Sequence, residues 1–474
     1  MEKQRRQASS TSIATASSTP GEHTPRGLRF VDLFAGLGGF HVGLEALGHE
    51  CVFACESNQQ LQDVYEKNFD IRPAGDIRQV AAADVPGHDI LCAGFPCQPF
   101  SRAGKRAGAS CPESGKLIDD VLRIVGHHQP SYVLLENVPN VLTIANGSFW
   151  EHIQRSLQAL GYEVQHRIYS PLQFGLPQQR LRLFVVAAKD GLLQSFKWPD
   201  PPPTPVLPLS QFVIDAPEDV RPIEPQKRAV LEHWNRLIPM LPELSYLTIL
   251  AAEFGADYPV EGLPYRGWRK YCGAFGVPLT HAKSRAAAIA LLPHYVASRD
   301  DGRPPAWMNL SIAYSRRMYA SRRSDFDVWK TGIMGLPNSW QKLEWQGDRS
   351  VRDLWNHTLQ FRASGIRVVR PELAPSLVAM SETQTPIIGF RRRYISVREA
   401  AALQTLQHLR VFPDGTSHAF KALGNAVNAK IVNAIVGSLT GTGGAKDVSC
   451  QRGTRYGYVQ PVAQPRLRPS PRTS

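Results

Sequence analysis

The stretch FVDLFAGLGGF, residues 30–40, begins as a short apolar strand pattern, passes through a glycine-rich turn and enters a helical pattern. Gly36, Gly38 and Gly39 allow the backbone to turn tightly and to approach a ligand closely. Glycine turns end many parallel strands, so a ligand site at this turn needs support from other residues.

The alternation of strands and helices continues from residue 28 to residue 188. Strand patterns occupy residues 28–34, 50–56, 88–94, 131–138 and 181–188. Helical periodicity occupies residues 39–47, 58–68, 115–128 and 148–160. We therefore predict an α/β fold whose Rossmann-like sheet is mostly parallel, has helices on both faces and binds ligands beyond the carboxyl ends of its strands.

Glu56 closes the second strand pattern, twenty residues after Gly36. An acidic side chain at this place accepts hydrogen bonds from ribose hydroxyls. The pair predicts an adenosine-containing cofactor and leaves a dinucleotide and S-adenosylmethionine both open. The turn AGLGG lacks the full GxGxxG spacing, which counts against a nicotinamide cofactor.

The composition indicates which class of partner and which cellular compartment to expect. A formal net charge of +13 over 474 residues favours a polyanionic partner, with nucleic acid ahead of a membrane surface. Seven cysteines, an odd number with irregular spacing, predict a reducing compartment and no disulfide framework. Cys51 and Cys55 lack a second pair with zinc-like spacing, so we predict no metal site. No apolar run is long enough for a membrane helix, and we expect a cytoplasmic protein.

Three reactive side chains follow predicted strands. Cys97 stands between two prolines in GFPCQPFS, residues 94–101, and is either a buried thiol in a turn or a nucleophile held at the edge of the sheet. Glu136 ends the strand of LLENV, where partial desolvation raises its pKa. Arg180 and Arg182 alternate in PQQRLR and share one face as the next strand begins. A thiol, a carboxyl group and a guanidinium are thus expected on one rim.

The ordered series DLFAGLGGF, GDI (75–77), GFPCQPFS, ENV, QQRLR and GNAV (424–427) resembles the DNA cytosine-5 methyltransferase family of bacterial restriction–modification systems. The resemblance covers residues 27–190 and 390–440. It implies that Cys97 adds to carbon 6 of cytosine, that Glu136 hydrogen-bonds ring nitrogen 3 and the exocyclic amine, and that Arg182 orients the base. We also predict a catalytic role for Arg180. The alternative is a structural role, in which Arg180 organises its loop or forms an ion pair.

The resemblance also implies S-adenosylmethionine as the cofactor. Phe34 would lie against the adenine, Glu56 would hold the ribose, and Asn425 would return to the pocket from the far end of the sequence. The complete set of implied cofactor residues is Phe34, Gly36, Leu37, Gly39, Glu56, Asp76, Ile77, Pro96, Leu117, Asn425 and Val427. Ser57 departs from the family, which commonly has a large apolar residue directly after the ribose-binding acid.

The resemblance divides the chain into five segments. We predict a disordered arm over 1–26, a catalytic and cofactor-binding domain over 27–190, a smaller loop-rich target-recognition domain over 191–390, a segment returning to the catalytic domain over 391–440 and a disordered basic tail over 441–474. Two stretches of the middle domain, YRGWRKYCG (265–273) and YSRRMYASRR (314–323), interleave basic and aromatic residues. Each is a solvated surface or a nucleic-acid contact.

The implied activity is transfer of a methyl group to carbon 5 of a cytosine flipped out of a specific duplex sequence. Double-stranded DNA is the expected partner of a monomer that has no membrane role and acts near the nucleoid, and any restriction endonuclease would be a separate protein. Two alternatives stay open: an RNA cytosine-5 methyltransferase that uses the same core, and a catalytically inactive homologue that binds DNA. A Rossmann oxidoreductase is disfavoured, since its chemistry does not require the proline–cysteine elbow.

Overall fold

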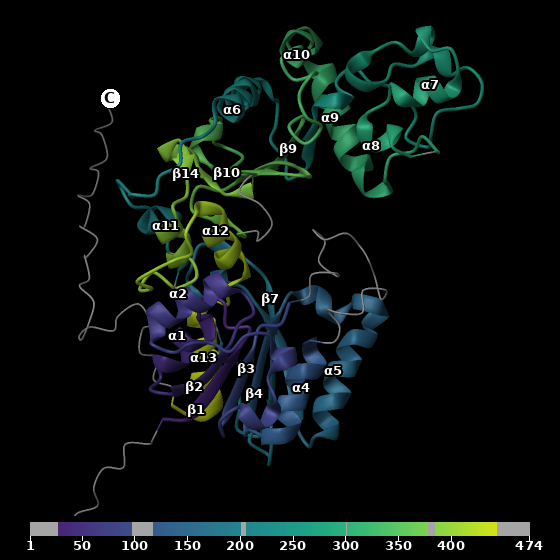
Figure 1. The fold of residues 1–474 in the computed structure, drawn as a ribbon. Helices are drawn as coiled ribbons and strands as arrows, with labels where there is room; N and C mark the ends of the chain where they lie inside the picture. The colour runs from purple at the N-terminus through teal and green to yellow at the C-terminus, as the bar shows by residue number, and fades with distance from the viewer. Residues whose placement is uncertain (1–26, 97–116, 201–204, 300, 378–383, 443–474) are drawn as a thin grey trace, which may run out of the picture.

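The computed structural model describes residues 27–96, 117–200, 205–299, 301–377 and 384–442 (Figure 1). Cys97, the predicted arm 1–26 and the predicted tail beyond residue 442 lie outside the described residues. Figure 1 shows a lower part built around β1–β7 and an upper part that contains α6–α10 and β8–β14.

The lower part is built on a six-stranded sheet in the order β2-β1-β3-β4-β7-β5. Neighbouring strands from β2 to β4 run parallel, whereas β7 runs antiparallel to both β4 and β5. The predicted mostly parallel α/β sheet is thereby confirmed. The strands are β1 (Arg29–Leu33), β2 (Glu50–Cys55), β3 (Ile90–Ala93), β4 (Tyr132–Asn137), β5 (Glu163–Tyr169) and β7 (Arg182–Ala188).

Helices cover both faces of this sheet because its central strands are apolar on both sides, as parallel strands usually are. On one face, α4 (Leu117–His128) and α5 (Ser148–Ala159) pack their apolar side chains against Val31, Leu91 and Val133. On the other face, α1 (Gly39–Glu45) and α13 (Ala429–Thr440) pack against Phe30, Ile90 and Leu134. The helix α2 (Gln59–Phe69) follows β2 and lies beside α1 through aromatic contacts.

The last helix, α13, reaches this core from the far end of the sequence (Figure 1). Ile431, Val432 and Ile435 are almost fully buried in the core that α1 also joins. Asn433 Nδ2 donates to the Gly43 carbonyl at 3.0 Å. Burial of each of the large aliphatic side chains stabilises the fold by about 1.5–3 kcal/mol. The returning segment is therefore part of the hydrophobic core around the first sheet.

The upper part contains a second six-stranded sheet in the order β14-β13-β10-β11-β9-β8. Its strands are short, and their apolar faces pack with α6 (Pro225–Leu237) around Trp234, Trp345 and Phe254. The strands are β8 (Thr248–Leu250), β9 (Lys342–Gln346), β10 (Thr358–Arg362), β11 (Gly365–Val369), β13 (Ile387–Ile388) and β14 (Arg393–Tyr394).

Residues 251–341 form a helical lobe inserted between β8 and β9, which are hydrogen-bonded neighbours in this sheet. The lobe has a hydrophobic cluster of its own, centred on Tyr258, Leu279 and Val296. Figure 1 shows it projecting from the second sheet on the side of the molecule that carries α4 and α5. Its helices are α7 (Arg285–Ala290), α8 (His294–Ala297), α9 (Asn309–Ser321) and α10 (Arg323–Lys330).

Some residues between the predicted boundaries at 190 and 390 pack with the lower part of the molecule. The boundaries themselves stay predictions. Leu193 and Phe196 pack in the core of the first sheet. Ala374 and Leu377 pack with Leu37 in a cluster that includes α11 (Val397–Ala402) and α12 (Thr416–Asn425). A short pair of parallel strands, β6 (Gln178–Gln179) and β12 (Ala374–Pro375), adds a hydrogen-bonded connection.

Candidate active site

The glycine turn between β1 and α1 adopts backbone angles that side chains resist. Gly36 and Gly38 have φ values of 53° and 77°, and Phe34 also has a positive φ of 58°. A Cβ atom at Gly38 would stand 2.4 Å from the Phe69 ring, so both the angle and the space require glycine there. Phe34, directly after the last residue of β1, lines a pocket at the carboxyl end of that strand.

Glu56, at the end of β2, is fixed to this turn by its carboxylate. Oε2 accepts a hydrogen bond from the Gly36 backbone N–H at 3.0 Å, and Oε1 accepts one from the Asn58 N–H at 2.9 Å. Burial raises the pKa of Glu56 above its ordinary value, whereas the backbone donors act in the opposite direction. Each carboxylate oxygen keeps a further lone pair that a ligand hydroxyl can use.

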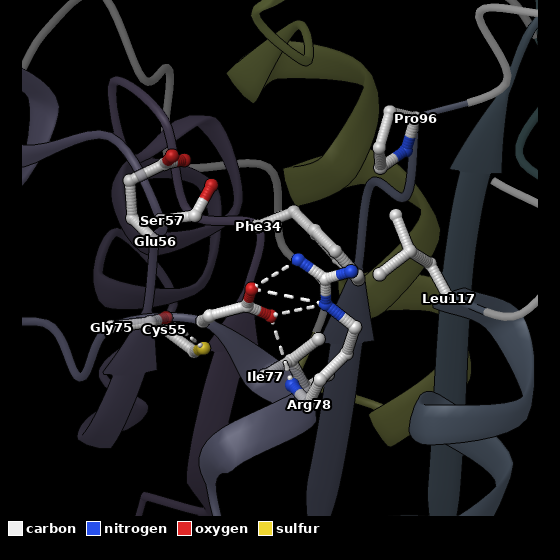
Figure 2. Close-up of a pocket in the computed structure, with 10 residues that line it drawn as sticks. Phe34, Cys55, Glu56, Ser57, Gly75, Ile77, Arg78, Pro96 and Leu117 are labelled. Atoms are coloured by element: carbon white, nitrogen blue, oxygen red, sulfur yellow. Dashed lines mark hydrogen bonds and ion pairs between the residues drawn. The ribbon is translucent and has the colours of Figure 1, made fainter. Parts of the chain in front are cut away.

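The pocket has a volume of about 220 Å³ and brings together residues from five separate segments (Figure 2). The predicted cofactor residues that line it are Phe34, Glu56, Asp76, Ile77, Pro96 and Leu117. The pocket therefore combines an aromatic ring, apolar side chains and carboxylates, as expected for a nucleoside.

Arg78 also lines the pocket, although the sequence analysis does not single it out. Its Nε donates to both carboxylate oxygens of Asp76 at 3.0 Å, and this pairing lowers the pKa of Asp76. Figure 2 shows the Arg78 guanidinium among the lining residues, on the side toward Leu117. The sequence signal for this ion pair is modest: a basic residue two positions after an aspartate at the start of a turn.

Other predicted cofactor residues lie away from the lining of this pocket. Leu37 is 1% exposed and packs in the core that includes α12. At Gly39, a Cβ atom would stand 2.3 Å from the Val427 carbonyl oxygen, so these two residues are in close backbone contact. Asn425 is the exposed last residue of α12. Contact of these residues with a cofactor stays a prediction.

Glu136 and Arg182 form a buried ion pair at the end of β4. Arg182 Nε lies 2.9 Å from Glu136 Oε1, because β4 and β7 are antiparallel neighbours. Burial raises the pKa of Glu136, although Arg182 and Arg180 lower it. The ion pair with Arg182 is thus the polar contact that the described residues give Oε1.

Arg180 is directed at backbone carbonyls on two distant segments. Its Nη2 donates to the Ala426 carbonyl at 3.0 Å, and its Nη1 donates to the Leu377 carbonyl at 3.3 Å. The side chain is fully buried, and desolvation lowers its pKa. This geometry corresponds to the alternative in which Arg180 organises its surroundings, while contact with a substrate stays untested.

The chain that leads to Cys97 leaves the sheet next to Glu136. Asn137 Nδ2 donates to the Phe95 carbonyl at 2.9 Å. A Cβ atom at Gly94 would stand 3.8 Å from Glu136 Oε2, so this backbone passes close to the carboxylate. Pro96 lines the pocket directly before the segment that is not described.

A buried polar cluster supports the glycine turn from beneath. The Tyr65 hydroxyl donates to Asp32 Oδ2 at 3.3 Å and lies 2.7 Å from His41 Nδ1. The His41 ring stacks on Phe69 with a centroid distance of 4.0 Å. Burial raises the pKa of Asp32 well above its ordinary value and lowers the pKa of His41 to about 4. Both groups are therefore favoured in their neutral forms.

The neutral His41 makes stability depend on pH. The unfolded chain protonates this histidine below its ordinary pKa of 6.5, whereas the folded chain does so only near 4, so stability falls as pH falls between these values. We expect the unfolding free energy to drop by about 2 kcal/mol more in the wild type than in His41→Asn between pH 7 and pH 5. Urea titrations of both proteins at the two pH values measure this difference. Equal losses in both proteins would contradict the assignment.

The fold and the pocket define an α/β protein with a pocket of aromatic, apolar and carboxylate side chains at the carboxyl ends of parallel strands, and with a buried carboxylate–guanidinium pair in the same domain. The family model described as C-5 cytosine-specific DNA methylase matches residues 28–236. Over this region the chain is similar to that family.

Curated relatives agree with this family. The Type II methyltransferase M.HhaI of Haemophilus parahaemolyticus is 44% identical over 176 residues, which are 37% of this chain and 54% of that protein. The Type II methyltransferase M.AluI of Cellulosimicrobium cellulans is 29% identical over 86% of this chain and 91% of that protein. Apart from M.AluI, the alignments with the first relatives span about half of their length.

Solved structures are also similar to this chain. The S. pombe Dnmt2 methyltransferase aligns with a TM-score of 0.45 and 17% identity over 87% of this chain and 98% of that chain. Separately, none of the helices that the structure describes is long and apolar enough to cross a membrane.

Proposed function

We propose that this chain is a DNA (cytosine-5)-methyltransferase that uses S-adenosylmethionine and acts on a cytosine flipped out of a specific duplex sequence. The observation that carries the proposal is the buried Glu136–Arg182 pair beside the chain segment that leads from Gly94 to the pocket residue Pro96, in a region that matches the C-5 cytosine-specific DNA methylase model. Cysteine chemistry at Cys97 completes the proposal by resemblance.

The pocket residues fit S-adenosylmethionine. Glu56 offers fixed acceptors for ribose hydroxyls, and Phe34 and Ile77 offer apolar surface for an adenine. Arg78 adds a planar guanidinium at the pocket side, which favours stacking on an aromatic ring system. When bound, S-adenosylmethionine supplies an electrophilic methyl group on a sulfonium sulfur. The chain holds its nucleoside end through these residues.

The proposed chemistry at the base depends on three side chains. The Cys97 thiolate forms a bond to carbon 6 of cytosine, which gives carbon 5 the character of an enamine. Glu136 stabilises the negative charge that develops on ring nitrogen 3 through a hydrogen bond, and burial, which raises the pKa of its carboxyl group, favours the form that can donate it. Arg182 fixes the Glu136 carboxyl group and orients the base carbonyl. After methyl transfer, carbon 5 loses its proton to solvent and the bond from carbon 6 to sulfur breaks.

The upper part is proposed to read the DNA sequence and to offset the few kcal/mol that base flipping costs. Its basic and aromatic surface residues are the types that contact phosphates and base edges. We further propose that the chain acts as a monomer on the DNA of a bacterial cytoplasm, close to the nucleoid. Any cognate restriction endonuclease would be a separate protein.

A direct experiment is incubation of the protein with S-adenosylmethionine carrying a labelled methyl group and with mixed duplex DNA, followed by mapping of labelled cytosines. We expect label on carbon 5 within one sequence context, and no label on tRNA or other RNA. A covalent complex is expected on DNA that contains 5-fluorocytosine, and Cys97→Ser is expected to abolish it. Label on RNA alone, or a complex that survives Cys97→Ser, would overturn the proposal.

A further inference from the structure

The helical lobe of residues 251–341 carries a concentrated set of cations. Between Tyr258 and Arg285 the sequence holds five Lys or Arg residues and a single acidic residue, Glu261. We call the following set the basic turn: Tyr265, Arg266, Arg269, Lys270, Lys283 and Arg285. Of these, Arg285 is half-buried and the others are exposed. Among the residues that the structure describes, the ion pairs found do not involve any cation of this set.

Aromatic rings lie beside three of these cations. The Arg285 guanidinium lies 4.4 Å from the Tyr265 ring centroid, and the Arg269 guanidinium lies 4.6 Å from that of Trp268. Lys270 Nζ lies 5.1 Å from the Tyr271 ring centroid. Tyr265 itself is 85% exposed, an unusual position for an aromatic ring that only serves packing. Cation–π contacts restrict the charged groups before any partner arrives, which lowers the entropy lost on binding.

We propose that the basic turn binds the phosphate backbone of duplex DNA outside the methylated sequence and extends the bound length of DNA. This rests on the proposed function. Phosphate oxygens match ring-supported guanidinium and ammonium groups, and phosphate contacts carry no sequence information. The lobe is inserted between two strands of the second sheet, and Trp268 and Tyr271 of the basic turn region pack with the lobe's separate hydrophobic cluster instead of with that sheet. The basic turn therefore adds affinity and leaves sequence preference to other residues.

This assignment has a quantitative consequence for salt dependence. Each lost phosphate contact lowers the slope of log affinity against log salt concentration by about 0.9. The triple variant Arg266→Ala/Arg269→Ala/Lys270→Ala is therefore expected to reduce that slope by about 2.7. The fold loss in affinity should be the same for a duplex that contains the methylated sequence and for a scrambled duplex of equal length.

The test measures binding of the full chain to both duplexes over a range of salt concentrations, with methyl transfer followed in parallel. The control variant Lys67→Ala/Arg155→Ala/Lys421→Ala removes the same charge from exposed positions on α2, α5 and α12. The inference is supported if the slope of log affinity against log salt concentration becomes smaller in the lobe variant and not in the control variant. The loss of affinity should also disappear on a duplex trimmed to the methylated sequence.

Three results would overturn the inference. An unchanged slope in the lobe variant, an equal change in the control variant, or a loss confined to the methylated sequence would each exclude a backbone contact at the basic turn. If the wild type neither methylates DNA nor binds either duplex, the proposed function fails with it. If the wild type methylates and binds DNA, and the lobe variant has the same affinity and the same salt dependence, only the inference about the lobe fails.

Discussion

Glu136→Gln is expected to slow methyl transfer by about 10²–10³-fold, while S-adenosylmethionine binding is retained. The physical reason is the burial of the carboxyl group, which is 6% exposed and has a raised pKa. A protonated carboxyl group can share its proton with ring nitrogen 3 as charge develops there, whereas an amide cannot change its protonation state. Single-turnover rates at saturating cofactor measure this loss.

The pH dependence separates this role from a structural one. A raised carboxyl pKa means that Glu136 stays protonated to a higher pH than an ordinary glutamate, so the rate component that needs the proton falls as pH rises through that pKa. The glutamine variant should lack this decline. Glu151→Gln, on the exposed surface of α5, serves as the matched control. A glutamine variant with the pH profile of the wild type would refute the assignment.

Arg180→Met is expected to lower the unfolding free energy by about 2–5 kcal/mol. The substitution preserves much of the side-chain volume and removes the donors to the Ala426 and Leu377 carbonyls, which are both buried. Each carbonyl left without a partner costs about 1–3 kcal/mol. Urea denaturation measures the total, and amide hydrogen exchange in α12 and α13 reports whether the returning segment loosens.

Arg180→Lys provides the comparison, because one ammonium group cannot reproduce a fork that reaches two carbonyls. We expect it to fall between the wild type and Arg180→Met in stability. Arg155→Met, on the exposed surface of α5, should change little. A loss below about 1 kcal/mol in Arg180→Met would show that the two segments are held together by other contacts.

The sequence predicted the strands of the first sheet except the edge strand β5. Periodicity over 148–160 matches α5 (Ser148–Ala159), because one apolar face of that helix is buried. The strand β5 (Glu163–Tyr169) was missed, since most of its side chains are at least partly exposed and its polar residues give no apolar run. The strands of the second sheet were also missed, because two to five residues are too few to show a period.

The sequence identified several residues that line the pocket, but it did not identify the partners that hold the site residues in place. Glu56 and Phe34 meet in one pocket because strand ends in a parallel sheet share an edge. Arg78 was not singled out, since an exposed arginine after GDI is common on any surface. The partners of Arg180 could not be predicted either, because Leu377 and Ala426 lie some two hundred residues further along the chain.

The position of α13 has a consequence for how the protein is made. A ribosome adds about 5–20 residues per second, so α13 is synthesised tens of seconds after β7. During that interval, the apolar face of the nascent sheet that α13 finally covers is open to water and to chaperones. Unfinished chains that end before α13 therefore lack a complete core.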